Sequence, residues 1–213
     1  MSGFQAFNAA GKLQVDGTYK PAMISQYVNI GGLWDQGYYQ INNPFGDAYS
    51  FGSLPMNFYP NPSTRWVRLN AGAFCFPGAE AFQPNSGQMM ISTASVGVSS
   101  GYLDVFDPSG NLIWSAVSAS AVPRIIDFID VPAGYDLQNN TWVKNLGFQP
   151  WFLMNACPGN ISDDGSALGY SGVVIRWDGS QIQVRYISQY QNSYMTALGG
   201  IGLKIPLAYF TGY

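Results

Sequence analysis

The pattern of apolar and polar positions predicts short antiparallel strands joined by tight turns. In residues 102–116, YLDVFDPSGNLIWSA, apolar positions alternate with polar ones, and Asp107–Gly110 supplies a turn before the return strand. Near the N-terminus, residues 6–13, AFNAAGKL, align with residues 105–112, VFDPSGNL. A looser copy, RWDGSQI, covers residues 176–182 around Asp178 and Gly179. The chain therefore repeats one unit, which is a strand, an Asx–Gly turn and a second strand.

The remaining pattern extends this unit into a fold. Further strands are predicted at residues 23–30, 65–70, 72–76, 87–98, 124–131, 146–157 and 203–210. We expect residues 124–131, RIIDFIDV, to be buried on both faces because they are almost continuously apolar. Turns recur about every 8–12 residues, and helical periodicity is nearly absent. We therefore expect an all-β fold with almost no helix: an antiparallel β-sandwich, or two small packed β-sandwich modules, built from repeated hairpins.

The chain divides by composition into three parts. Residues 1–30 hold the first hairpin and a strand, residues 31–63 are rich in Gly, Asn, Pro and aromatic residues, and residues 64–213 form the sandwich body. A long run without periodicity is usually functional or ordered by a partner. Its aromatic side chains either fold back on their own sheet, cover a neighbouring subunit or stack on a sugar. The candidate binding residues are Trp34, Tyr38, Tyr39, Phe45 and Tyr49, together with Tyr190 and Tyr194 of a later YQNSY stretch.

Composition favours assembly over binding to nucleic acid or membrane. Charged residues make up 10% of the 213 residues, and the net charge is -3, whereas about 25% is usual. Surfaces with few charges lose little hydration when they meet. The nine basic residues are scattered, so no cluster matches a run of phosphates. No window approaches about 18 consecutive apolar residues, and the first residues do not resemble a secretory signal, so we expect no membrane insertion.

Candidate catalytic and metal-binding groups are few. The chain has no histidine, which removes imidazole bases and the commonest zinc ligand. Asp127 and Asp130 are spaced so that they point to opposite faces of a strand, and they cannot flank one glycosidic bond. Asp163 and Asp164 are predicted to lie in a solvated turn, because they lack the spaced ligands of a calcium loop. We expect no enzyme activity, cofactor or metal, and we expect Cys75 and Cys157 to be buried thiols.

The N-terminal residues 3–20, GFQAFNAAGKLQVDGTYK, resemble a recurring phrase of bacteriophage tail-tip and tail-fibre-associated proteins. The matching positions are Gly3, Phe4, Ala6, Phe7, Asn8, Ala9, Gly11, Leu13, Val15 and Asp16. The resemblance implies a virion structural protein of the tail tip, baseplate or fibre, assembled in the host cytoplasm. It also implies contacts with other tail proteins and a homo-oligomer, either a trimer or a ring.

Two functions follow as hypotheses. The first is a non-enzymatic structural protein of a phage tail, which acts by subunit–subunit packing. The alternative is a receptor-binding module of a tail fibre that recognises a host surface glycan. In the alternative, exposed rings such as Trp34, Tyr38 and Tyr39 and residues 190–194 would stack on sugars, while polar side chains bond the hydroxyls.

Overall fold

The computed structural model describes residues 5–7, 11, 13–30, 38–41, 44–46, 49–53 and 63–213, without the side chains of residues 13–15, 38–40 and 49–53. The fold is all-β, and the described strands pair antiparallel in two large sheets and two separate hairpins. The six-stranded sheet has the order β12 (Arg124–Val131), β18 (Leu203–Tyr209), β14 (Trp151–Leu153), β6 (Thr64–Leu69), β9 (Gly87–Thr93) and β3 (Met23–Asn29).

The second large sheet contains the longest strands of the chain. Its order is β13 (Trp142–Asn145), β17 (Gln181–Gln189), β16 (Leu168–Trp177), β7 (Phe74–Phe76), β8 (Ala81–Phe82), β5 (Tyr49–Ser53) and β4 (Tyr38–Ile41), with β15 (Gly159–Asp163) beside β16. The described helices are all short: η2 (Pro77–Ala79), η3 (Ala116–Ala121), η4 (Met154–Ala156) and α1 (Tyr194–Ala197). No helix in the described part of the chain is long and apolar enough to cross a membrane.

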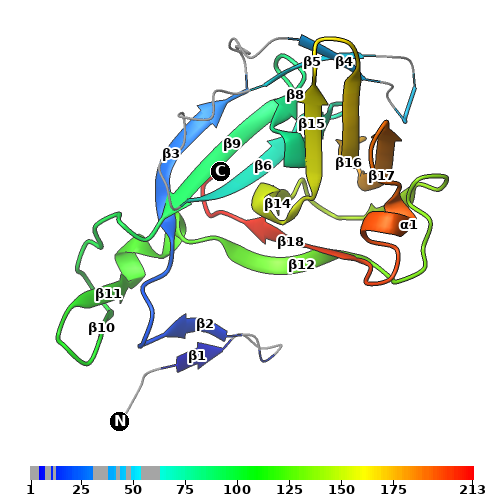
Figure 1. Cartoon of the computed structure of the whole chain (residues 1–213). Helices are drawn as coiled ribbons and strands as arrows, with labels where there is room; N and C mark the ends of the chain where they lie inside the picture. The colour runs from blue at the N-terminus through cyan, green and yellow to red at the C-terminus, as the bar shows by residue number, and fades with distance from the viewer. Residues whose placement is uncertain are drawn as a thin grey trace.

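The main core lies between the two large sheets, which makes the body a β-sandwich (Figure 1). Val67, Met89 and Ile205 of the six-stranded sheet belong to the same buried cluster as Val173 and Ile175 of the other sheet. The predicted β-sandwich is therefore confirmed. Cys75 and Cys157 are free thiols, and both are buried as predicted.

The six-stranded sheet also buries side chains on its outer face. Side chains alternate along a strand, so Trp66, Met90 and Trp151 point away from the main core and form a separate buried cluster. Phe210, just beyond β18, completes this cluster through edge-on contacts with Trp66 and Trp151, at ring-centroid distances of 6.0 Å and 5.6 Å. The centre of this sheet is thus covered on both faces.

The predicted burial of residues 124–131 is wrong, although the strand has the predicted bounds. This strand is β12, an edge strand of the six-stranded sheet, and Ile125 and Ile126 are exposed. A bulge between Ile125 and Asp127 shifts the register there. Burial depends on what packs against each face, and an apolar run alone does not supply that neighbour.

The composition-based boundaries do not coincide with the sheets. β3, from the first predicted part, is an edge strand of the six-stranded sheet, and β4 and β5, from the second, belong to the eight-stranded sheet. The predicted strand at residues 146–157 is shorter than expected, since only Trp151–Leu153 is extended before η4 begins.

Candidate binding surfaces

Two hairpins with the same construction stand apart from the sandwich (Figure 1). Hairpin 1 pairs β1 (Gln5–Phe7) with β2 (Leu13–Asp16), and hairpin 2 pairs β10 (Asp104–Phe106) with β11 (Leu112–Ser115). Both have an identical register when aligned by the sequence repeat, and in both the register shifts just before the phenylalanine. The repeat found in the sequence is therefore a repeat of structure.

Each hairpin exposes an apolar side chain at the equivalent position. Phe7 is 57% exposed and Phe106 is 54% exposed, and these residues pair with Leu13 and Leu112 respectively. Each hairpin forms its own two-stranded sheet and pairs with no other described strand. A lone two-stranded hairpin is marginally stable in water, so these two elements are suited to gain stability from a covering partner.

Hairpin 2 carries further exposed apolar residues, and one of them is held in a strained conformation. Tyr102 is fully exposed and has φ 60°, in the left-handed region, which costs an L-residue roughly 1–2 kcal/mol. Leu103 and Val117 are also exposed. Backbone strain of this kind is typical of functional positions. In hairpin 2 the strained residue is one whose aromatic ring is exposed to solvent.

Replacing Tyr102 by glycine is expected to stabilise the isolated chain by about 0.5–1 kcal/mol, because glycine adopts the left-handed conformation without steric cost. Urea unfolding followed by circular dichroism measures the change. Tyr19→Gly is the matched control, since Tyr19 is exposed but does not have a positive φ, and it should give no gain. Equal destabilisation by both variants would contradict the strain at Tyr102.

Two carboxylates of hairpin 2 hold its loops. Asp107 Oδ1 accepts hydrogen bonds from the backbone N–H groups of Ser109 and Asn111, both at 2.8 Å, and Oδ2 accepts one from the Asn111 side chain. These bonds, led by that of the Asn111 side chain, lower the pKa of Asp107. The pKa of Asp104 is also lowered, chiefly by the backbone N–H of Gly101 and then by the Ser100 hydroxyl. Both are therefore turn-stabilising anions at neutral pH.

The remaining candidate catalytic carboxylates do not converge on one point. Asp127 pairs with Lys144 of β13 at 2.5 Å, and Asp130 pairs with Lys204 of β18 at 3.6 Å. Asp163 is the last residue of β15. Among the described residues, no three His, Cys, Asp or Glu side chains are grouped so that they could hold a metal ion.

Asp164 lies in the turn that follows β15. Its Oδ1 accepts hydrogen bonds from the hydroxyl and backbone N–H of Ser166 and from the N–H of Ala167. These bonds, led by the Ser166 hydroxyl, lower the pKa of Asp164 to about 2. The carboxylate is thus an exposed turn-capping group.

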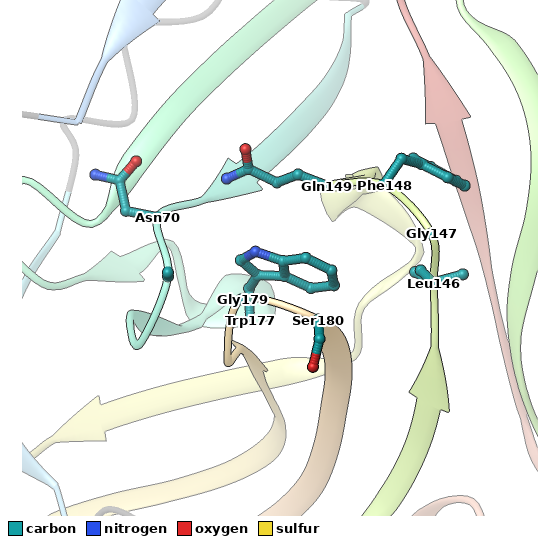
Figure 2. Close-up of a pocket in the computed structure, with 9 residues that line it drawn as sticks. Asn70, Leu146, Gly147, Phe148, Gln149, Trp177, Gly179 and Ser180 are labelled. Atoms are coloured by element: carbon teal, nitrogen blue, oxygen red, sulfur yellow. The ribbon is translucent and has the colours of Figure 1, made fainter.

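A shallow pocket of about 520 Å³ lies at one end of the sandwich. Figure 2 shows the Trp177 indole between Asn70 and Gln149 on one side and Ser180 on the other. The complete lining is Asn70, Ala71, Leu146, Gly147, Phe148, Gln149, Trp177, Gly179 and Ser180. These residues come from the turn after β6, the segment before β14, the end of β16 and the β16–β17 turn.

The pocket lining can form hydrogen bonds but offers no acid or base. It contains no charged side chain and no thiol. Asn70 and Gln149 already donate to the backbone carbonyls of Asn85 and Leu69, at 2.8 Å and 2.5 Å. Trp177 is only 5% exposed, too little to provide a platform for a sugar ring. The pocket suits a small neutral group more than a saccharide.

The structure describes only some of the predicted binding residues of segment 31–63. Trp34 lies outside the described residues, and Tyr38, Tyr39 and Tyr49 lie on β4 and β5, whose side chains at these positions are not described. Phe45 is half-buried and packs edge-on against Phe74 at 6.4 Å, on the outer side of the eight-stranded sheet. Phe45 thus folds back on its own sheet, which was one of the alternatives considered.

The two predicted tyrosines of the C-terminal stretch have opposite environments. Tyr194 is fully buried in the main core against Tyr186, so the prediction that it stacks on a ligand is wrong. Its position at the start of α1 turns it inward. Tyr190 is exposed and has φ 56°. The adjacent Gln191 is bonded to Ser171 and Ser162, both at 2.9 Å, which fixes the loop that displays Tyr190.

Sequence reasoning did not name the exposed phenylalanines of the two hairpins, Phe7 and Phe106, as binding residues. Phe7 and Phe106 occupy the same position of the sequence repeat. This repeated phenylalanine was the feature of the sequence that could have identified them. Their exposure depends on whether another part of the fold covers them, and the local pattern of apolar and polar residues does not predict that.

Comparison with known proteins gives a family. No curated protein and no solved structure matches the chain. A family model described as a domain of unknown function, DUF8377, matches residues 1–212. Because the match covers nearly the whole chain, this protein belongs to the DUF8377 family.

Proposed function

We propose that this chain is a non-enzymatic structural protein of a bacteriophage tail, and that it acts by packing against other subunits. The observation that carries the proposal is the pair of hairpins outside the sandwich, each with an exposed phenylalanine and no covering strand among the described residues. Such elements gain stability when a neighbouring subunit buries them. The tail assignment itself rests on the resemblance of residues 3–20 to tail-associated proteins.

The composition supports the same proposal. A surface with few charges loses little hydration on assembly, and only 10% of the residues are charged. The carboxylates of Asp104 and Asp107 in hairpin 2 already accept hydrogen bonds from nearby backbone N–H groups. Their orientation is therefore fixed before a partner arrives. A tail tip, baseplate or fibre position and a trimeric or ring-shaped homo-oligomer belong to this proposal.

Immunogold labelling of intact particles tests the tail assignment. Phage particles are purified from cells that produce this chain, and an antibody against the chain is expected to label their tails. Label on the capsid would contradict the tail position and leave a structural role. Protein found only free in the lysate, with no label on particles, would contradict the structural function.

A second candidate function is recognition of a host surface glycan, and Tyr190 favours it. Its ring is exposed on a loop that Gln191 braces, and amide side chains flank it in the sequence. An aromatic face can stack on a sugar ring while neighbouring amides bond its hydroxyls. Under this alternative, Tyr190→Ser would abolish binding to host surface saccharide without changing the melting temperature, and under the structural function no such binding exists.

A further inference from the structure

Hairpins 1 and 2 have the same construction. Each has a three-residue and a four-residue strand, the same register shift and the same exposed phenylalanine. Both therefore present an apolar ring beside unpaired strand edges, and two such elements can cover each other's exposed rings.

Building on the packing function above, we propose that the covering partner is a second copy of this chain, with hairpin 1 of one copy packed against hairpin 2 of the next. The contact joins two different surfaces, so it is head to tail. Such a contact closes into a ring if the rotation between copies permits and otherwise propagates.

Charge distinguishes this pairing from contacts between identical hairpins. Residues 94–122, which contain hairpin 2, include Asp104 and Asp107 and no lysine or arginine. Residues 1–22, which contain hairpin 1, include Lys12, Lys20 and Asp16. A contact between two copies of hairpin 2 would bring four carboxylates together, whereas the mixed contact brings unlike charges together.

The stretches that join the strands of the two hairpins carry their charges at different positions of the repeat, and each of these charged residues is matched by an asparagine in the other hairpin. Asn8 stands where hairpin 2 has Asp107, and Lys12 stands where it has Asn111. By sequence, the stretch that joins the strands of hairpin 1 contains a lysine, and the one that joins the strands of hairpin 2 contains an aspartate. Asp107 keeps its charge at neutral pH, because Asn111 and Ser109 bond to the carboxylate.

The apolar residues supply the remainder of the contact. Tyr19 is exposed just after hairpin 1, and Tyr102, Leu103 and Val117 are exposed around hairpin 2. Each hairpin is small compared with the roughly 800 Å² per partner of a standard interface. The single contact is therefore expected to be weak in solution and to be strengthened where the copies close into a ring, because the last contact is then intramolecular.

Complementation between two variants tests the proposal. Phe7→Asp disables hairpin 1 and Phe106→Asp disables hairpin 2, and both positions are exposed, so the sandwich should melt unchanged. Analytical ultracentrifugation over a range of concentrations is expected to show self-association of the unaltered chain. Each variant alone should associate at least about tenfold more weakly, as expected for loss of a central contact.

Mixing the two variants gives the decisive result. The mixture has one intact hairpin 1 and one intact hairpin 2, so it should form a 1:1 dimer that does not grow further. Ile201→Asp, an exposed apolar position outside both hairpins, is the matched control and should associate like the unaltered chain.

Three outcomes would overturn the inference: a monomeric unaltered chain at every concentration, self-association of either variant alone at unaltered strength, or a mixture that stays monomeric. These outcomes are separate from the labelling of particles. Labelled tails with a monomeric chain would overturn only the head-to-tail contact. Head-to-tail association without labelled particles would overturn only the proposed function.

Discussion

Replacement of Gly172 by alanine is expected to destabilise the fold by about 3 kcal/mol, the upper end of the usual cost of overpacking and a large part of the 5–15 kcal/mol that stabilises a typical domain. Gly172 has φ 151°, and an added Cβ would lie 2.4 Å from the Cα of Gly159 and 2.6 Å from both the carbonyl oxygen of Pro158 and a ring carbon of Phe76. Two of these three neighbours are backbone atoms, which cannot move aside without shifting β15. The clash therefore cannot be relieved by a side-chain movement alone.

Gly172 belongs to a group of three glycines that lets three segments touch. A Cβ on Gly159 would approach the Phe76 ring to 2.6 Å, and one on Gly78 of η2 would approach the backbone nitrogen of Gly159 to 2.3 Å. Urea unfolding followed by circular dichroism measures the effect. Gly97→Ala is the control, since no heavy atom lies within 4 Å of its added Cβ, and its change should stay within about 0.5 kcal/mol. Equal midpoints for the two variants would refute the close packing.

Truncation of Trp151 to alanine is expected to cost about 3–5 kcal/mol, as for other large buried aromatic residues. Trp151 is 1% exposed and contacts Phe210, Tyr27 and Arg68, whose guanidinium lies 4.6 Å from the ring centroid. These contacts hold the C-terminal residues onto the outer face of the six-stranded sheet. The variant therefore tests whether the outer cluster is a second core.

Trp151→Phe should cost much less than the alanine variant. The buried indole N–H of Trp151 has no hydrogen-bond partner among the described residues, so phenylalanine removes an unsatisfied donor along with part of the ring. Trp114→Ala in hairpin 2 is the control, because that indole is half-buried and outside all the buried clusters. Far-ultraviolet circular dichroism is the suitable probe, since tryptophan fluorescence changes with the substitution itself. A loss at Trp151 no larger than that at Trp114 would refute the second core.

Local features of the fold were predictable from the sequence. The turn at Asp178 and Gly179 joins β16 to β17 as expected, and the Asp178 carboxylate bonds the N–H groups of Ser180 and Gln181 at 2.9 Å and 2.8 Å. Asp107 has the same role in hairpin 2. Such turns depend on residues a few positions apart, so a single sequence contains what determines them.

Features set by distant neighbours were not predictable. The run RIIDFIDV has the composition of a central strand, yet it is the edge strand β12, because only one side of it finds a neighbouring strand. Tyr194 and Tyr190 lie four positions apart in one polar stretch, and one is in the core while the other is exposed. For the candidate surfaces, the repeat identified the hairpins but not the absence of a covering element.

The ion pair between β12 and β13 affects how the body behaves at high concentration. Open sheet edges recruit strands from other molecules and so promote aggregation, and natural proteins protect them with charges and bulges. Lys144 on the edge strand β13 reaches across to Asp127 and to the carbonyl of Phe128 on the edge strand β12, where the bulge also lies. This side of the sandwich thus carries two of the features by which natural proteins protect sheet edges. For a protein with 47% hydrophobic residues, we expect this protection to slow amyloid-like stacking along this side at high concentration.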